Sequence, residues 1–210
     1  MDNVMKKFNV FSEWVMHLFM LQVLWLGGTL FGGVILGIFP ATVAVFSTIQ
    51  KLKRREAEFS VFSYYVQAYK KNFKESLFIG GITLIIGLIG AVYVYFLNTT
   101  TNSWLAYTHF FMYLMLLLMG LFLFYLIPVY IHYEVKMTDL VKTTFFIMLS
   151  SMKWNLPLLL TLLAAFLIFL RFSVVILFFG ASLPMFITFY FCMKAFDDFD
   201  VKREKYDRYR

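Results

Sequence analysis

Four long apolar stretches dominate the chain, at residues 14–49, 76–97, 105–131 and 156–193. The second and the third are about 22 and 27 residues long, close to the roughly 20 residues that a helix needs to cross the hydrocarbon core of a bilayer. The first is too long for one crossing, because its helix would measure roughly 54 Å against a core of about 30 Å. The fourth has the same excess length, so each of these two stretches is predicted to be a pair of spans.

The basic residues predict how the spans are arranged, since Lys and Arg in short loops mark the cytoplasmic side of a membrane. Basic residues flank the first apolar stretch at both ends: Lys6, Lys7, Lys51, Lys53, Arg54 and Arg55. Both ends are then cytoplasmic, and the stretch is a hairpin that we expect to turn at Gly27 and Gly28. The alternative is a five-span chain with one crossing before Lys51. It would place either the N-terminus or the basic segment after that crossing on the wrong side.

The resulting prediction is an all-α polytopic transmembrane helical bundle that forms a single membrane domain over residues 1–210. It has six spans in three hairpins, and both termini are cytoplasmic. The spans are expected at about residues 11–27, 29–50, 76–97, 105–131, 155–170 and 172–193. The third hairpin turns at Arg171, which is the one residue among the 19 Lys and Arg residues that this arrangement leaves outside.

Two connections between the hairpins are predicted to be amphipathic helices at the membrane surface, at about residues 59–75 and 139–153. In the first, apolar and aromatic side chains recur at helical spacing, and the polar side chains occupy the other face. The basic residues of this polar face are Lys70, Lys71 and Lys74. Such a helix lies on the bilayer with its cations near anionic lipid head groups. The tail at residues 197–210 balances five acids against five bases, which is typical of a solvated helix extension or a loose tail.

Composition and charge agree with a membrane protein. Hydrophobic residues make up 61% of the chain and charged residues only 15%, which is outside the range of a water-soluble domain. The net charge of +7 does not indicate nucleic acid as a partner, because the Lys and Arg residues lie in short blocks beside apolar segments. The expected partners are therefore the lipid bilayer and its anionic head groups.

The glycine-rich stretch at residues 27–41 allows two interpretations. A phosphate-binding loop is excluded, because Gly33 and Val34 stand where that motif needs Lys and then Ser or Thr. Close helix packing fits better, since small residues four apart let a second helix approach. The predicted packing residues are Gly28, Gly32, Gly33, Gly37 and Ala41. They could meet a helix of the same chain or of a second copy in a homo-oligomer. Pro40 is expected to kink its helix.

A few polar residues fall inside or beside the predicted spans, where they are costly and therefore informative. The candidate polar or ligand-site residues are Glu13, His17, Gln22, Pro40 and Arg171. Glu13 and His17 share a helix face, so they could form a titratable patch inside the bundle or a local pair at the head groups. Arg171 could capture an anion or extend to the interface. No catalytic set, metal-binding set or cofactor site follows from the spacing of the His and acidic residues. An enzyme is therefore not expected.

The chain resembles the YesL-like family of small bacterial membrane proteins, whose function is largely uncharacterised. The resemblance rests on Leu24-Trp25-Leu26, Gly37-Ile-Phe-Pro40-Ala41-Thr42, Tyr69-Lys-Lys-Asn72-Phe73-Lys and Ser182-Leu-Pro184. The chain differs from the usual family pattern at residues 27–33, where bulkier residues are expected. The resemblance implies a Gram-positive bacterium, a plasma-membrane location and an association with carbohydrate uptake.

Two functions are carried forward from these patterns. The first is a non-enzymatic accessory or assembly factor that packs against the subunits of a sugar importer. The second is a small permease for a sugar or another small solute, with a site at mid-membrane depth near Pro40 and Gln22. Flux through liposomes that contain the purified protein alone would favour the permease. Copurification with an importer, without such flux, would favour the accessory role.

Overall fold

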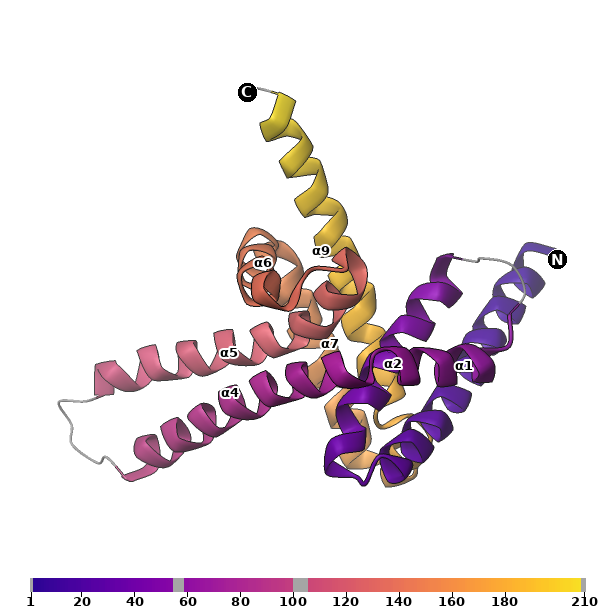
Figure 1. The fold of residues 1–210 in the computed structure, drawn as a ribbon, viewed down its shortest axis with the longest axis horizontal. Helices are drawn as coiled ribbons and strands as arrows, with labels where there is room; N and C mark the ends of the chain where they lie inside the picture. Colours follow the sequence, from indigo (N-terminus) through magenta and orange to yellow (C-terminus); the bar gives the residue numbers. More distant parts are fainter. Residues whose placement is uncertain (1, 55–58, 100–105, 209–210) are drawn as a thin grey trace.

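The computed structural model describes residues 2–54, 59–99 and 106–208, and these ranges form helices joined by short connections (Figure 1). The helices are α1 (Asp2–Phe31), α2 (Ile35–Arg54), α3 (Val61–Lys71), α4 (Phe73–Thr99), α5 (Ala106–Tyr133), α6 (Met137–Ser150), α7 (Met152–Arg171), α8 (Ser173–Phe179) and α9 (Ser182–Arg208). The prediction of an all-α fold is confirmed.

Five of these helices are long and apolar enough to cross a membrane, namely α1, α2, α4, α5 and α7. The pair α8 and α9 passes the same test together but is bent by 65° at its break, so it forms a broken sixth span or a re-entrant segment. The chain is thus a polytopic helical membrane protein with five or six candidate spans. The third hairpin turns directly after Arg171, where α7 ends.

The first hairpin turns later than predicted, which corrects the position at Gly27 and Gly28. Helix α1 continues through both glycines to Phe31, and α2 begins at Ile35. The chain reverses at Gly33 and Val34, whose φ angles of 76° and 57° lie in the left-handed region. The backbone N–H of Val34 donates to the carbonyl of Thr29 at 2.9 Å and closes the turn. Glycines inside a continuous helix, such as Gly27, do not by themselves mark a turn.

Helix α3 packs its apolar face on the α1–α2 hairpin. Val61, Tyr65 and Ala68 are buried there, whereas Phe62 on another side of the helix is 56% exposed. The amphipathic pattern that predicts a surface helix therefore has a protein partner. The helix is also shorter than the predicted 59–75, because α4 already begins at Phe73. The location of α3 at the membrane surface stays a prediction.

Two apolar clusters hold the helices together, and α9 belongs to both. Phe189 of α9 joins the cluster built from α1, α2 and α3. Cys192 and Phe196 join the cluster built from α4, α5, α6 and α7. Helix α9 is thus one of the elements that connect the first hairpin to the rest of the chain, beside the direct contacts of α2 with α4 and α5. It continues to Arg208, so the described part of the predicted tail is an extension of this helix.

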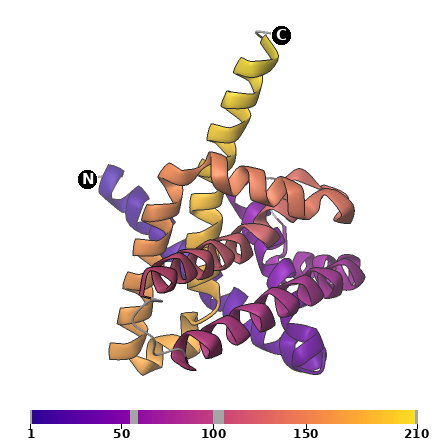
Figure 2. The same ribbon diagram turned by 90° about the vertical axis from the view of Figure 1, so that its left-hand side faces the viewer.

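Helices α4 and α5 lie side by side and extend away from the other elements (Figures 1 and 2). Large apolar side chains of α4 are uncovered along this projecting part, among them Leu84, Ile85, Leu88 and Val92. Such surface is stable only against lipid or another protein.

Side-chain contacts hold α9 at the point where it extends beyond the other helices. Asp198 lies 2.5 Å from the ammonium of Lys153 and accepts a hydrogen bond from the indole of Trp154 at 2.6 Å. The hydroxyl of Tyr133 donates to Asp200 at 3.0 Å. Helix α6 lies beside this junction and occupies residues 137–150 rather than the predicted 139–153. It buries Leu140, Thr144, Ile147 and Met148.

Candidate functional site

The structure does not bring the predicted polar patch on α1 together. Glu13 is exposed and His17 is half-buried. Among the described residues, no hydrogen bond or ion pair joins these two side chains, and the ring of His17 instead packs edge-on to Trp14 at 6.4 Å. Gln22 is buried elsewhere on the helix, at 4% exposure. The three residues therefore do not form one site.

Gln22 has a structural partner at the break between α8 and α9. Its side-chain oxygen accepts hydrogen bonds from the backbone N–H groups of Ala181 and Ser182, each at 3.0 Å. Backbone amides freed by a helix break need such partners, because the membrane interior offers no water. The side-chain oxygen of Gln22 is thus engaged by the protein itself.

Glycines at the first hairpin allow backbone and side chains to approach closely. A Cβ atom added to Gly37 would lie 2.9 Å from the carbonyl oxygen of Gly28 and would also meet the carbonyl of Thr29. Ala41 is fully buried at the same contact, and Pro40 beside it is buried within α2. A Cβ atom on Gly32 would meet the backbone of Gly37.

Gly33 differs from the other predicted packing residues. It has open space around its Cα and a φ of 76°, so its role is in the turn and its assignment to the packing face is corrected. A sequence motif of small residues cannot distinguish a glycine needed for space from a glycine needed for its backbone angle.

Two tyrosines of α3 cover this glycine contact. The hydroxyl of Tyr69 donates to the carbonyl of Gly28 at 3.0 Å. The hydroxyl of Tyr65 is buried without a hydrogen-bond partner in the described residues. Burial raises the pKa of both tyrosines above its ordinary value. Both hydroxyl groups are therefore neutral at physiological pH.

The predicted basic residues lie at the ends of helices, mostly on the surface. Lys51 lies over the ring of Tyr64 at 4.2 Å and over that of Phe59 at 4.8 Å. Most of the others are exposed: Lys53, Arg54, Lys70, Lys71, Lys74 and Arg171. Arg55 lies outside the described residues.

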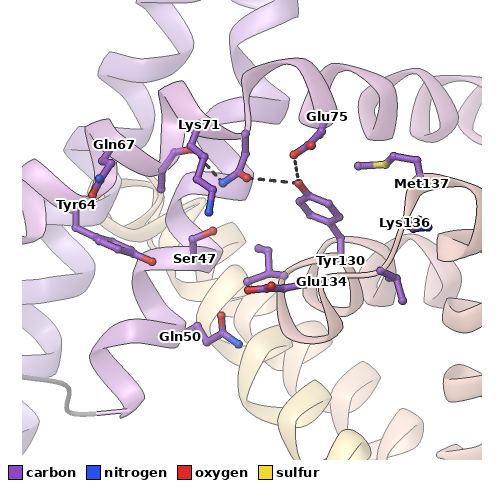
Figure 3. Close-up of a pocket in the computed structure, with 14 residues that line it drawn as sticks. Ser47, Gln50, Tyr64, Gln67, Lys71, Glu75, Tyr130, Glu134, Lys136 and Met137 are labelled. Atoms are coloured by element: carbon purple, nitrogen blue, oxygen red, sulfur yellow. Dashed lines mark hydrogen bonds between the residues drawn. The ribbon is translucent and has the colours of Figure 1, made fainter.

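A polar cavity of ≈ 520 Å³ lies where the ends of α2, α3, α4 and α5 meet (Figure 3). Almost none of its lining residues was a candidate site residue in the sequence. The polar and charged lining residues are Ser47, Gln50, Tyr64, Gln67, Lys71, Asn72, Glu75, Tyr130, Glu134 and Lys136. The lining contains two lysines and two glutamates, so its formal net charge is zero.

Hydrogen bonds fix one wall of this cavity. The hydroxyl of Tyr130 donates to the carboxylate of Glu75 and lies 3.4 Å from the side-chain oxygen of Asn72. The amide nitrogen of Asn72 in turn donates to the carbonyl of Ala68 at 3.1 Å. These contacts join α5 to the junction of α3 and α4, so the protein's own side chains hold this wall in place.

Two opposite charges face the cavity from different elements. Lys71, at the end of α3, points toward Ser47 of α2, and Glu134, directly after α5, points toward Gln50 (Figure 3). Glu134 adopts a φ of 47°, which is uncommon for a residue other than glycine. Glu134 belongs to the short segment between α5 and α6.

Sequence patterns did not reveal this cavity, and of its lining only Lys71 was a candidate. Its residues come from five separate segments, and each polar residue by itself looks like an ordinary helix end at a membrane interface. The nearest signal was the Asn72 segment, which carries part of the family resemblance. In the described part of the chain, no group of three His, Cys, Asp or Glu residues could hold a metal ion.

Comparison with known proteins adds relatives without an assigned activity. A family model described as "Protein of unknown function, DUF624" matches residues 18–94. The uncharacterized protein YesL of Bacillus subtilis is 28% identical over 209 residues, which cover 94% of this chain and 93% of YesL. The uncharacterized YteU of the same organism is 28% identical over 82% of this chain and 78% of its own length. The uncharacterized YesV, also from this organism, is 32% identical over 60% of each chain. No solved structure matches the chain significantly.

Proposed function

Since the DUF624 family model matches residues 18–94 and the chain is similar to YesL, YteU and YesV, for which no activity is named, we propose a function from its own geometry. The proposed function is that of a non-enzymatic accessory or assembly factor, which packs in the plasma membrane against subunits of a carbohydrate uptake system. Both termini face the cytoplasm in this proposal, as the distribution of basic residues predicts. The carbohydrate part rests on the family resemblance alone.

The observation that carries the accessory role is the uncovered surface of the α4–α5 hairpin. A Cβ atom added to Gly81 or Gly87 of α4, or to Gly120 of α5, would meet nothing within 4 Å. Gly87 and Ala91 are exposed one helical turn apart. Small residues at this spacing let a partner helix approach closely inside a membrane. A projecting hairpin of this kind suits a protein that binds another membrane protein.

The permease alternative has less support. Gln22 already accepts two backbone hydrogen bonds, and Pro40 is buried within the packing of the first hairpin. Three cavities among the described residues are lined by other side chains, at helix ends or beside α8. A transport site near Pro40 would need space that none of these three cavities provides.

Substitution of Gly87 by leucine tests the accessory role. The tagged chain would be expressed in a Gram-positive host, crosslinked in membranes and purified in mild detergent, with sugar importer subunits measured by mass spectrometry. The added side chain blocks close approach to α4, so we expect recovery of these subunits to fall at least about tenfold, the equivalent of 1.4 kcal/mol in binding. Gly27→Leu is the matched control, because Gly27 also has open space but lies on α1.

Two outcomes contradict the proposal. If the wild-type chain recovers no importer subunit after crosslinking, the protein is not an accessory of such a system. If the purified chain alone moves a sugar across liposomes, the permease alternative replaces it.

A further inference from the structure

The polar cavity at the helix ends presents opposite charges on facing walls. Lys71 enters from α3 and Glu134 from the segment after α5 (Figure 3). No ion pair joins these two side chains in the part of the chain that the structure describes. Each charge therefore remains available to a ligand that occupies the space between them.

The charge balance of the cavity restricts the ligand. Lys71 and Lys136 oppose Glu75 and Glu134, so the formal charge of the lining is zero. A lone anion or a lone cation would meet repulsion as well as attraction, and recognition depends on avoiding such like-charge contacts. A ligand with one charge of each sign matches both walls.

The backbone at Glu134 supports a role for its carboxylate. A left-handed φ of 47° at a residue other than glycine costs on the order of 1 kcal/mol. The side chain is exposed, so packing does not explain why glutamate stands where glycine would fit more easily. Strain of this kind is frequent at ligand-binding positions.

From these features we propose that the cavity binds a small zwitterion, a molecule with an ammonium group and an anionic oxygen group a few bonds apart. The anionic group accepts hydrogen bonds from Lys71, and the ammonium donates to Glu134. Ser47 lies beside Lys71 and Gln50 beside Glu134, and both supply further hydrogen bonds to the ligand (Figure 3). The amide of Gln50 is oriented by the ring nitrogen of His132 at 3.5 Å.

This chemistry has two sources at a membrane surface. One is a soluble zwitterion from the surrounding solution. The other is the head group of phosphatidylethanolamine, because α2, α4 and α5 are candidate spans whose ends line the cavity. Both carry a primary ammonium near an anionic oxygen group, so the same walls would recognise either.

The test uses the full chain in nanodiscs made only of phosphatidylglycerol, with binding measured by titration calorimetry. The probes are glycerophosphoethanolamine, glycerophosphocholine, glycerophosphoglycerol and an uncharged disaccharide. We expect the first to bind at least about tenfold more tightly than the others, because a charge-assisted hydrogen bond contributes about 1.5–3 kcal/mol. The choline group has no N–H to donate, and the glycerol head group has no cation. Native mass spectrometry of the chain in nanodiscs containing phosphatidylethanolamine identifies the lipid source if that lipid is retained and blocks the soluble probe.

Two variants assign the binding to this cavity. Lys71→Gln removes the cation, and Glu134→Gly removes the carboxylate while relieving the backbone strain, so neither is expected to prevent folding. Each should weaken glycerophosphoethanolamine at least about tenfold. The matched controls are Lys70→Gln and Glu204→Gln, which change exposed charges outside the cavity lining.

The proposal is overturned if no probe binds at millimolar concentration, or if both cavity variants bind like the wild type. It is also overturned if glycerophosphoglycerol binds as tightly as glycerophosphoethanolamine. Tighter binding of an uncharged disaccharide, lost in the same two variants, would assign the cavity to neutral sugars instead.

Discussion

Replacing Gln22 by methionine removes one acceptor and keeps nearly the same side-chain volume. In the structure this acceptor serves two backbone amides, the part-buried one of Ala181 and the buried one of Ser182, each at 3.0 Å. A buried donor left without a partner costs about 1–3 kcal/mol, although hydrogen bonds measured inside a membrane protein average about 0.6 kcal/mol. With two donors affected, we expect the variant to lose about 2 kcal/mol of unfolding free energy.

Thermal unfolding in detergent micelles, followed by circular dichroism, measures this loss. For a chain of this size, 1 kcal/mol corresponds to about 2–4 °C, so the Tm of Gln22→Met should fall by at least about 4 °C. Hydrogen exchange at residues 181 and 182 should accelerate in the same variant. Gln22→Glu, measured at a pH where the carboxyl group is neutral, is the control, because it keeps an oxygen that accepts both hydrogen bonds and buries no charge.

The reasoning is refuted if the Tm of Gln22→Met stays within about 1 °C of the wild type, a change worth less than about 0.5 kcal/mol. It is equally refuted if Gln22→Glu loses as much stability as Gln22→Met. In the second case an oxygen acceptor at this position would not be sufficient for stability.

The other predictions use the same unfolding assay or a topology reporter. Gly27→Ala should raise stability by about 0.5–1 kcal/mol, because Gly27 lies inside α1 with open space around it. A loss of stability would instead support a turn at Gly27. Gly37→Ala should cost about 1–3 kcal/mol, because its new methyl group would meet backbone carbonyl oxygens, and an unchanged Tm would contradict this close contact. Thr29→Val should stabilise the chain by about 1 kcal/mol, since the buried hydroxyl of Thr29 has no partner among the described residues, and a loss would indicate one. Alkaline phosphatase fused after Arg210 should be inactive and after Arg171 active, and the reverse would invert the proposed orientation.

The helical nature of the chain and the approximate positions of its long apolar helices were predictable because each span requires a long apolar stretch, whatever its neighbours are. The structure gives five or six candidate spans, against the six predicted. Arg171 lies at the end of α7 for a related reason, since a charge interrupts an apolar stretch most easily at a turn. The turn of the first hairpin was misplaced because several glycines compete there. Only the backbone angles at Gly33 and Val34 identify the reversal.

The candidate site was much less predictable than the spans. Gln22 was recognised as an unusual polar residue, but its partners lie in another span and follow from packing alone. Glu75 and Tyr130 are 55 residues apart, and no local pattern indicates that they meet. The left-handed conformation of Glu134 has no sequence signature either, because the residue type argues against it.

The cap supplied by Gln22 has a consequence for how the chain is made. The amide of Ala181 and its acceptor on α1 are 159 residues apart. A helix that is synthesised early thus supplies the hydrogen-bond acceptor for a segment that is synthesised late. Until α1 lies beside it, the break between α8 and α9 exposes two backbone donors that lipid cannot satisfy. We therefore expect the α8–α9 pair to reach its final packing only after α1 lies beside it. If α1 fails to insert, the break between α8 and α9 keeps two unpaired backbone donors, and we expect membrane proteases to degrade such a chain.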